Sequence, residues 1–178
     1  LSGEEKKKRM NQENNDIIIT TQDKIVIKPN SVNLTLNDTI GIYSDYVLDM
    51  KKENKVQTMQ IEENGMWLYP DEIYLGRTNE WTQTENLIPM MSGRSSLGRN
   101  GLHVHCSAGM GSIGYKGYWH MGIRATKPIL AVKDMKCCQI YYLTAEGENT
   151  QNYQGYMQNL SQEELGSPLH KTFVKKIK

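Results

Sequence analysis

The chain lacks the features that mark several large classes of protein. Its 178 residues include one Phe, three Cys and no long apolar run, so we expect neither a membrane segment nor a disulfide framework. The formal net charge of +1 provides no global field for binding nucleic acid. Cys137 and Cys138 are adjacent, a spacing that rarely forms a bond, and no signal peptide is recognisable. We therefore expect a cytoplasmic protein with reduced thiols.

Short runs rich in β-branched residues recur along the chain, separated by Asn, Asp, Gly and Pro. This pattern predicts an all-β barrel or jelly roll, with a helical turn over residues 95–98. The runs are Ile17–Ile19, Ile25–Ile27, Val32–Leu36, Val56–Ile61, Met66–Tyr69, Ile73–Thr78, Leu87–Met91, Leu102–Cys106, Tyr118–Ile123, Ile129–Val132 and Cys138–Thr144.

The two ends of the chain differ in pattern from the middle. Ser2–Glu5 has the form of a capping box and predicts a short helix to about Met10, too polar for a core element. Residues 146–159 are rich in Gly, Gln and Asn, which predicts a mobile arm. We therefore divide the chain into an N-terminal edge element (1–15), a barrel domain (16–145) and a C-terminal arm and tail (146–178).

The segment Gly93–Arg99 concentrates groups that suit a triphosphate. Arg94 and Arg99 carry guanidinium groups that match phosphate oxygens, and Ser95 and Ser96 add hydroxyl donors. Flanking glycines let the backbone approach a ligand closely. An equally simple interpretation is a surface turn with solvated arginines.

Several further segments follow in an order that resembles one known family. The chain is similar to the dCTP deaminase branch of the dUTPase superfamily, which has a G-R-S-S-x-x-R-x-G-L block, then V-H-x-T-A-G, then G-[FY]-x-G-x-[WI]. The matching segments are Gly93–Leu102, Val104–Gly109 and Gly114–Trp119, with Pro29–Leu36, Leu68–Pro70 and Tyr74–Thr78 upstream and Cys138–Tyr142 downstream.

The resemblance implies a dUTPase-like distorted jelly-roll β-barrel with short helices, assembled as a homotrimer with nucleotide sites between subunits. It implies no catalytic metal, and Mg²⁺ would accompany a bound triphosphate as its counter-ion. Ser95 would also lie near the reacting base. The nucleotide contacts implied by the resemblance are Arg94, Ser95, Ser96, Arg99, Ala108, Gly109, Tyr118 and Gln158.

Two carboxylates that the resemblance calls for are missing. The family's general acid/base Glu corresponds to Gly122, and the Asp that positions water in the dUTPase branch corresponds to Ser112. The closing arm retains a Gln at Gln158 but has Tyr156 and Met157 in place of the Lys-containing pattern. Without a carboxylate at Gly122, little deamination is expected.

Zinc chemistry has no support in the sequence. Zinc nucleoside deaminases use H-x-E and P-C-x-x-C motifs, and neither occurs here. His103 and His105 would share one face of a strand, but two imidazoles without a third ligand favour structural or pocket-lining roles.

The leading hypothesis is a catalytically inactive nucleotide-binding protein, acting as a sensor or sequestering protein, with phage–host conflict as one conceivable setting. The larger space at Gly122 would suit a ligand bulkier than cytosine: thymine, a modified pyrimidine or a dinucleotide signal. One alternative is an active dCTP deaminase with a displaced base, either His120 or a carboxylate such as Glu146 or Glu148. Another is a partner-binding scaffold that has lost its ligand.

Overall fold

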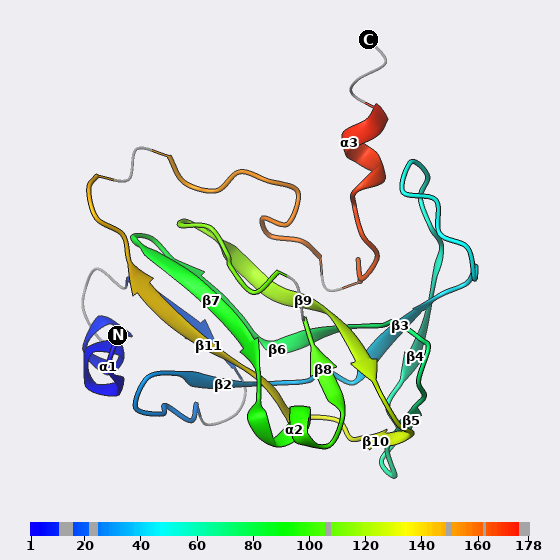
Figure 1. Cartoon of the computed structure of the whole chain (residues 1–178). Coiled ribbons are helices and arrows are strands. Elements are labelled where there is room, and N and C mark those ends of the chain that lie inside the picture. The colour runs from blue at the N-terminus through cyan, green and yellow to red at the C-terminus, as the bar shows by residue number, and fades with distance from the viewer. Residues whose placement is uncertain (11–15, 22–24, 106–107, 149–150, 162, 175–178) are drawn as a thin grey trace.

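The computed structural model describes the chain except residues 11–15, 22–24, 106–107, 149–150, 162 and 175–178 (Figure 1). Within the described part, antiparallel strands form three sheets, with helices near both ends and at one turn. None of the described helices is long and apolar enough to cross a membrane.

The largest sheet contains the two longest strands, β6 (Tyr74–Thr84) and β9 (Lys116–Ala125). Its order is β4-β3-β6-β9-β8, and β1 pairs with β6 away from this path. The other members are β1 (Ile17–Thr20), β3 (Thr39–Tyr43), β4 (Val56–Gln60) and β8 (Leu102–Val104).

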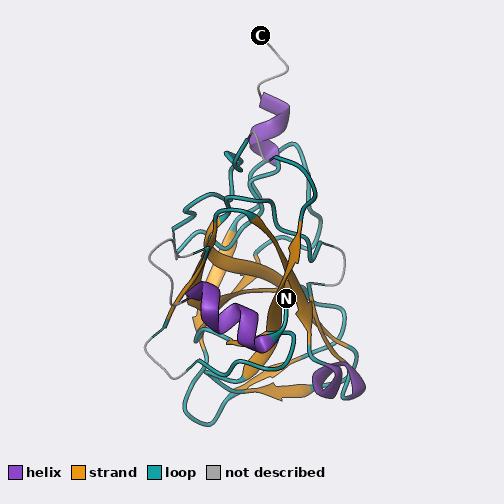
Figure 2. Cartoon of the chain, turned by 90° about the vertical axis from the view of Figure 1, so that its left-hand side faces the viewer, coloured by secondary structure: helices purple, strands orange, loops and turns teal. Residues whose placement is uncertain are grey.

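Two smaller sheets complete the barrel (Figure 2). One has the order β2-β11-β7, formed by β2 (Val32–Thr35), β11 (Lys136–Thr144) and β7 (Leu87–Gly93). The other pairs β5 (Met66–Leu68) with β10 (Ile129–Ala131). The sheets enclose one core of nearly inaccessible side chains, among them Leu34, Ile40, Leu68, Ile123 and Ile140.

Strand β9 has two faces with different roles. Trp119, Met121 and Ile123 belong to the hydrophobic core. Because successive side chains on a strand point to opposite sides, His120 and Gly122 lie on the other face. The pairing of β6 with β9 therefore positions the core residues of β9 and also Gly122, which corresponds to the Glu implied by the resemblance.

Three short helices accompany the strands. The predicted N-terminal helix is confirmed as α1 (Gly3–Met10), and the Glu5 backbone N–H donates to the Ser2 hydroxyl over 3.1 Å. The predicted helical turn is confirmed as α2 (Ser95–Arg99). A third helix, α3 (His170–Val174), was not predicted.

The C-terminal segment packs along the barrel before α3 (Figure 1). The backbone N–H groups of Tyr153 and Asn159 donate to the carbonyls of Ile113 and Lys116, both over 2.9 Å. Leu165 is buried further along the same segment. The C-terminal arm is thus attached to the start of β9 and to the segment before it by backbone hydrogen bonds.

The strand predictions were wrong in a few places. Ile25–Ile27 forms only an isolated bridge between Ile27 and Val32, and β3 was missed. Strand β6 continues to Thr84, well beyond the predicted Thr78. Strand β8 ends at Val104, while Cys106 lies outside the described residues.

Thr78 provides a test of the β6–β9 pairing. It is fully buried at a register shift, accepts from the Trp119 N–H over 3.1 Å and donates to the Glu80 carbonyl over 2.8 Å. Thr78→Val should lower the free energy of unfolding by about 2–3 kcal/mol, because both backbone partners lose a buried hydrogen bond. Urea denaturation measures this. The exposed Thr58→Val is the control, and equal effects of the two changes would contradict the assignment.

Candidate functional site

The predicted phosphate-binding block lies at α2, on the surface of the chain. Arg94 precedes the helix, and its Nη1 donates to the Lys136 carbonyl over 2.9 Å, which fixes the side chain beside β11. Ser95, Ser96 and Arg99 are exposed, and the first turn holds no acidic residue. The block therefore presents hydroxyl groups and positive charge to solvent, as an anionic ligand requires.

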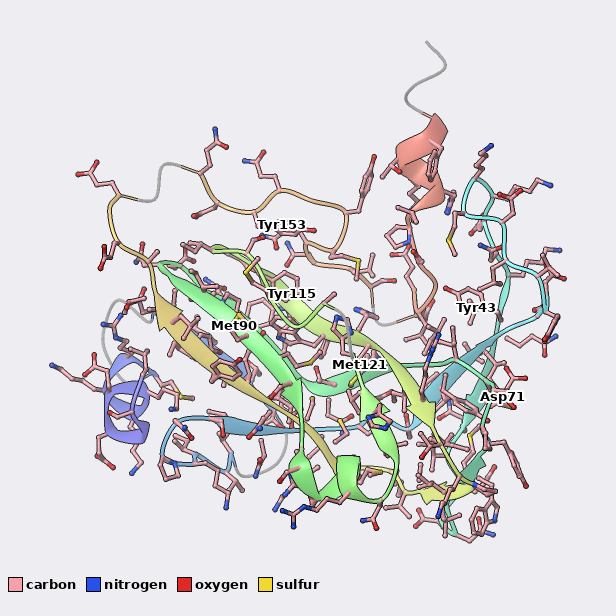
Figure 3. All side chains as sticks on the ribbon, in the orientation of Figure 1. Tyr43, Asp71, Met90, Tyr115, Met121 and Tyr153 are labelled. Atoms are coloured by element: carbon pink, nitrogen blue, oxygen red, sulfur yellow. The ribbon has the colours of Figure 1, made fainter. Side chains whose placement is uncertain are left out.

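A cavity of about 290 Å³ lies between the 105–115 segment, β9 and the C-terminal arm. Aromatic rings form much of its wall: the centroids of Tyr115 and Trp119 are 5.1 Å apart, and those of Tyr115 and Tyr153 are 6.1 Å apart. Figure 3 labels Tyr115 and Tyr153. Met110 and Met157 add further apolar surface. A flat, uncharged group such as a nucleobase would match this lining.

The polar side chains in the cavity are His105, Ser112 and His120, and none of its described lining residues is acidic. Strand β8 ends at Val104, and His105 follows it with a positive φ of 51°, outside the strand. The expectation that His103 and His105 share a strand face was therefore wrong. Burial lowers the pKa of His105, so this imidazole is neutral at pH 7.

His120 is the most enclosed of these three side chains. It is 9% exposed, and neither ring nitrogen has a partner in hydrogen-bond geometry among the described residues. Burial lowers its pKa below the ordinary 6.5, and the Arg77 guanidinium, paired opposite on β6, lowers it further. Three nearby groups raise the pKa of His120 instead: the carbonyls of Tyr118 and Ser161 and the Glu164 carboxylate. The ring is neutral at pH 7 and offers one donor and one acceptor.

Gly122 leaves open space two residues beyond His120. A Cβ atom built there would meet only the Ile73 Cγ2, at 4.0 Å, which is ordinary van der Waals contact. The Gly122 backbone carbonyl accepts a hydrogen bond from the His105 backbone N–H over 2.8 Å, which fixes the backbone at this position. The strand could therefore accept a Cβ atom at this point without backbone movement.

Two of the implied nucleotide contacts lie where the 105–115 segment meets β7. Ala108 lines the cavity. Gly109 has a structural role, since its carbonyl accepts from the Met91 N–H over 2.6 Å and a Cβ there would lie 2.3 Å from the Met91 oxygen. This close approach between two backbones requires glycine.

Two other implied contacts are engaged within the chain. The Tyr118 ring lies 5.1 Å from the Arg77 guanidinium carbon, a cation–π arrangement. The Gln158 carboxamide accepts from the Lys116 N–H and donates to the Gly114 carbonyl, both over 2.9 Å. Gln158 therefore attaches the arm to the start of β9.

The single chain does not assemble all of the predicted site. The cavity brings together Ala108, Ser112 and His120, whereas none of the α2 residues lines it. Glu146 and Glu148, considered as displaced bases, are exposed and also lie outside the lining. Sequence reasoning missed Tyr153 and Met157, whose only signal was apolar side chains within a polar arm.

Comparison with known proteins identifies the family. A family model described as dCTP deaminase-like matches residues 1–145. The chain belongs to the dCTP deaminase-like family. It is 44% identical over 176 residues to a "dCTP deaminase, dUMP-forming" of Leptospira biflexa, covering 99% of both chains. A protein of the same description from Hathewaya histolytica is 46% identical over 159 residues, covering 89% of this chain and 91% of that one. The resemblance inferred from the motifs is confirmed.

Solved structures confirm the dUTPase-like fold of this dCTP deaminase-like chain. The 2'-deoxycytidine 5'-triphosphate deaminase of Agrobacterium tumefaciens matches 80% of this chain and 45% of its own, with a TM-score of 0.62 and 14% identity. The EIAV dUTPase matches 79% of this chain and 98% of its own, with a TM-score of 0.51 and 14% identity.

The buried state of His120 predicts a pH dependence of stability. The unfolded chain binds a proton near pH 6.5, and the folded chain binds it only at lower pH, so stability falls as the pH drops below about 6.5. His120→Asn should reduce this slope in denaturant titrations at several pH values. His105→Asn measures how much the half-buried imidazole of His105 contributes to the same pH dependence. An unchanged slope in His120→Asn would contradict the neutral assignment.

Proposed function

We propose that this protein binds pyrimidine deoxynucleoside triphosphates and does not deaminate them at an enzymatic rate. The observation that carries the proposal is a base-sized cavity whose described lining contains Ser112 and His120 but no carboxylate. The extensive similarity to proteins described as dCTP deaminases supports the ligand class.

The chemistry of deamination explains why the missing carboxylates matter. Water attacking the 4-carbon of cytosine must lose a proton, and the ring nitrogen must gain one. Each positioned acid or base typically contributes about 10²–10⁴-fold, and a single Glu would serve both steps. Gly122 provides no such group, and the Ser112 hydroxyl is a poor base at neutral pH. We infer that binding persists while water activation is lost.

An assembly of several chains would complete the proposed site. We propose the homotrimer implied by the family, in which the α2 block of one subunit meets the aromatic cavity of another. Arg94, Ser95, Ser96 and Arg99 would hold the phosphates, with Mg²⁺ arriving on the triphosphate. No group of three or more His, Cys, Asp or Glu suited to holding a metal occurs among the described residues.

An active deaminase is the second candidate function. The observation that favours it is the neutral imidazole of His120, which has the protonation state of a general base. Glu164 is near enough to influence this ring, but it is exposed, accepts from the Ser161 hydroxyl over 3.3 Å and does not line the cavity.

The leading proposal, binding without turnover, would suit a cytoplasmic nucleotide sensor or sequestering protein.

Ligand binding and turnover can be measured together. Incubation with dCTP, dUTP or dTTP and Mg²⁺ should raise the thermal midpoint by several degrees, because a ligand that binds only the folded state stabilises it. No ammonia should be released from dCTP. Arg99→Ala should reduce the shift, while Arg124→Ala, on the exposed part of β9, is the control. Steady ammonia release would establish the active alternative, and no shift with any nucleotide would favour a scaffold.

Restoring the carboxylates tests the reason for inactivity. Gly122→Glu combined with Ser112→Asp should produce measurable deamination of dCTP, at least about 10²-fold above the unmodified protein. The backbone at Gly122 admits a Cβ atom without a close contact. The matched control is Gly122→Gln with Ser112→Asn, which has the same shape without an acid. Equal rates in the two double variants would contradict the proposed role of these positions.

A further inference from the structure

We propose that His120 recognises the 4-position of a bound pyrimidine and accepts both 4-amino and 4-oxo bases. This inference rests on the proposed nucleotide-binding function and assigns specificity within that site. It predicts a binding protein that does not discriminate between cytosine and uracil nucleotides.

The first observation is the hydrogen-bond state of the imidazole. His120 is more than nine-tenths buried and lines the cavity, and neither ring nitrogen has a partner in hydrogen-bond geometry among the described residues, although the carbonyls of Tyr118 and Ser161 lie near enough to raise its pKa. Buried polar groups in native proteins almost always have partners, and exceptions generally mark a functional site or a bound water. The aromatic cavity in front of this ring is large enough for a base. A ligand edge would supply the missing partner.

The second observation is the position of His120 relative to Gly122. The two residues lie on the same face of β9, about 7 Å apart along the strand. The motif resemblance implies that a deaminating member of the family would carry its general acid/base carboxylate at the position of Gly122, beside the 4-carbon of the base. His120 and Arg124 flank Gly122 on that face of the strand, and of these two side chains only His120 lines the cavity. The 4-substituent of a bound base would therefore face His120.

The tautomers of a neutral imidazole explain the dual acceptance. A 4-amino group donates hydrogen bonds, whereas a 4-oxo group accepts them. A carboxylate can only accept, so it would favour the amino form. A neutral imidazole can present either a bare nitrogen or an N–H to the ligand by changing tautomer. Its neutral state is supported by burial and by the adjacent Arg77, both of which lower the pKa.

Calorimetric titration of dCTP and dUTP into a set of position-120 variants tests the proposal. The unmodified protein should bind the two nucleotides within about threefold of each other. His120→Phe removes both nitrogens and should weaken both by about tenfold. His120→Asn, which retains a donor and an acceptor, should keep both affinities. His120→Asp accepts only and should bind dCTP at least tenfold better than dUTP.

A stability measurement distinguishes recognition from a structural role. Because His120→Phe removes buried nitrogens without partners, its thermal midpoint without ligand should equal or exceed that of the unmodified protein. A lower midpoint with unchanged nucleotide affinities would show that an ordered water satisfies the ring, and would overturn the proposal.

The tautomer itself can be observed. Long-range ¹⁵N–¹H spectra, with the His120 signals assigned by their loss in His120→Asn, should show opposite protonated nitrogens in the dCTP and dUTP complexes. The same tautomer in both complexes would overturn the mechanism. If neither nucleotide binds the unmodified protein, the proposed function itself fails. If both bind and every position-120 variant binds them equally, only the role of His120 fails.

Discussion

The antiparallel pairing of β6 with β9 is the constraint on which the rest of the structure depends. These are the two longest strands, and their register places Arg77 opposite His120 and Leu75 opposite Gly122. Period-two alternation then places Trp119 and Met121 on the core face and His120 on the other, and the cavity is lined by Trp119 as well as His120. A slip of one residue would exchange these two sets of side chains.

Much of the fold could be predicted from the sequence, because strand runs and ordered motifs are local signals. Predictions failed where local and tertiary preferences differ. Strand β3 (Thr39–Tyr43) contains a central glycine and follows an Asn-Asp turn, so its pattern is weak, yet pairing with both β4 and β6 stabilises it. Ile25–Ile27 has strong β propensity, but only Ile27 has a bridge partner.

The candidate site was predicted less completely, for a physical reason. Motif order identifies Arg94 and His120 as candidate residues, but it contains no information on whether they approach each other in one chain. The α2 block and the aromatic cavity are distinct surfaces of the single chain. The role of Tyr153 depends on where the arm packs, and that packing uses backbone hydrogen bonds that leave little sequence signal.

The proposed function separates binding from turnover. Aromatic rings, a serine and neutral imidazoles provide stacking and hydrogen bonds, which favour a bound base. Deamination also needs proton transfers, and Gly122 itself supplies no group for them, since a Cβ there would meet only the Ile73 Cγ2 within 4 Å. Because stacking and proton transfer depend on different side chains, a few substitutions could remove the second property and keep the first.

A single-turnover experiment tests this account most directly. With protein in excess over radiolabelled dCTP and Mg²⁺, all of the nucleotide would be bound, and chromatography after quenching would separate dCTP from dUTP and dUMP. The account predicts recovery of the bound nucleotide as unchanged dCTP over hours. Conversion of the bound nucleotide to dUTP or dUMP within seconds to minutes would contradict it.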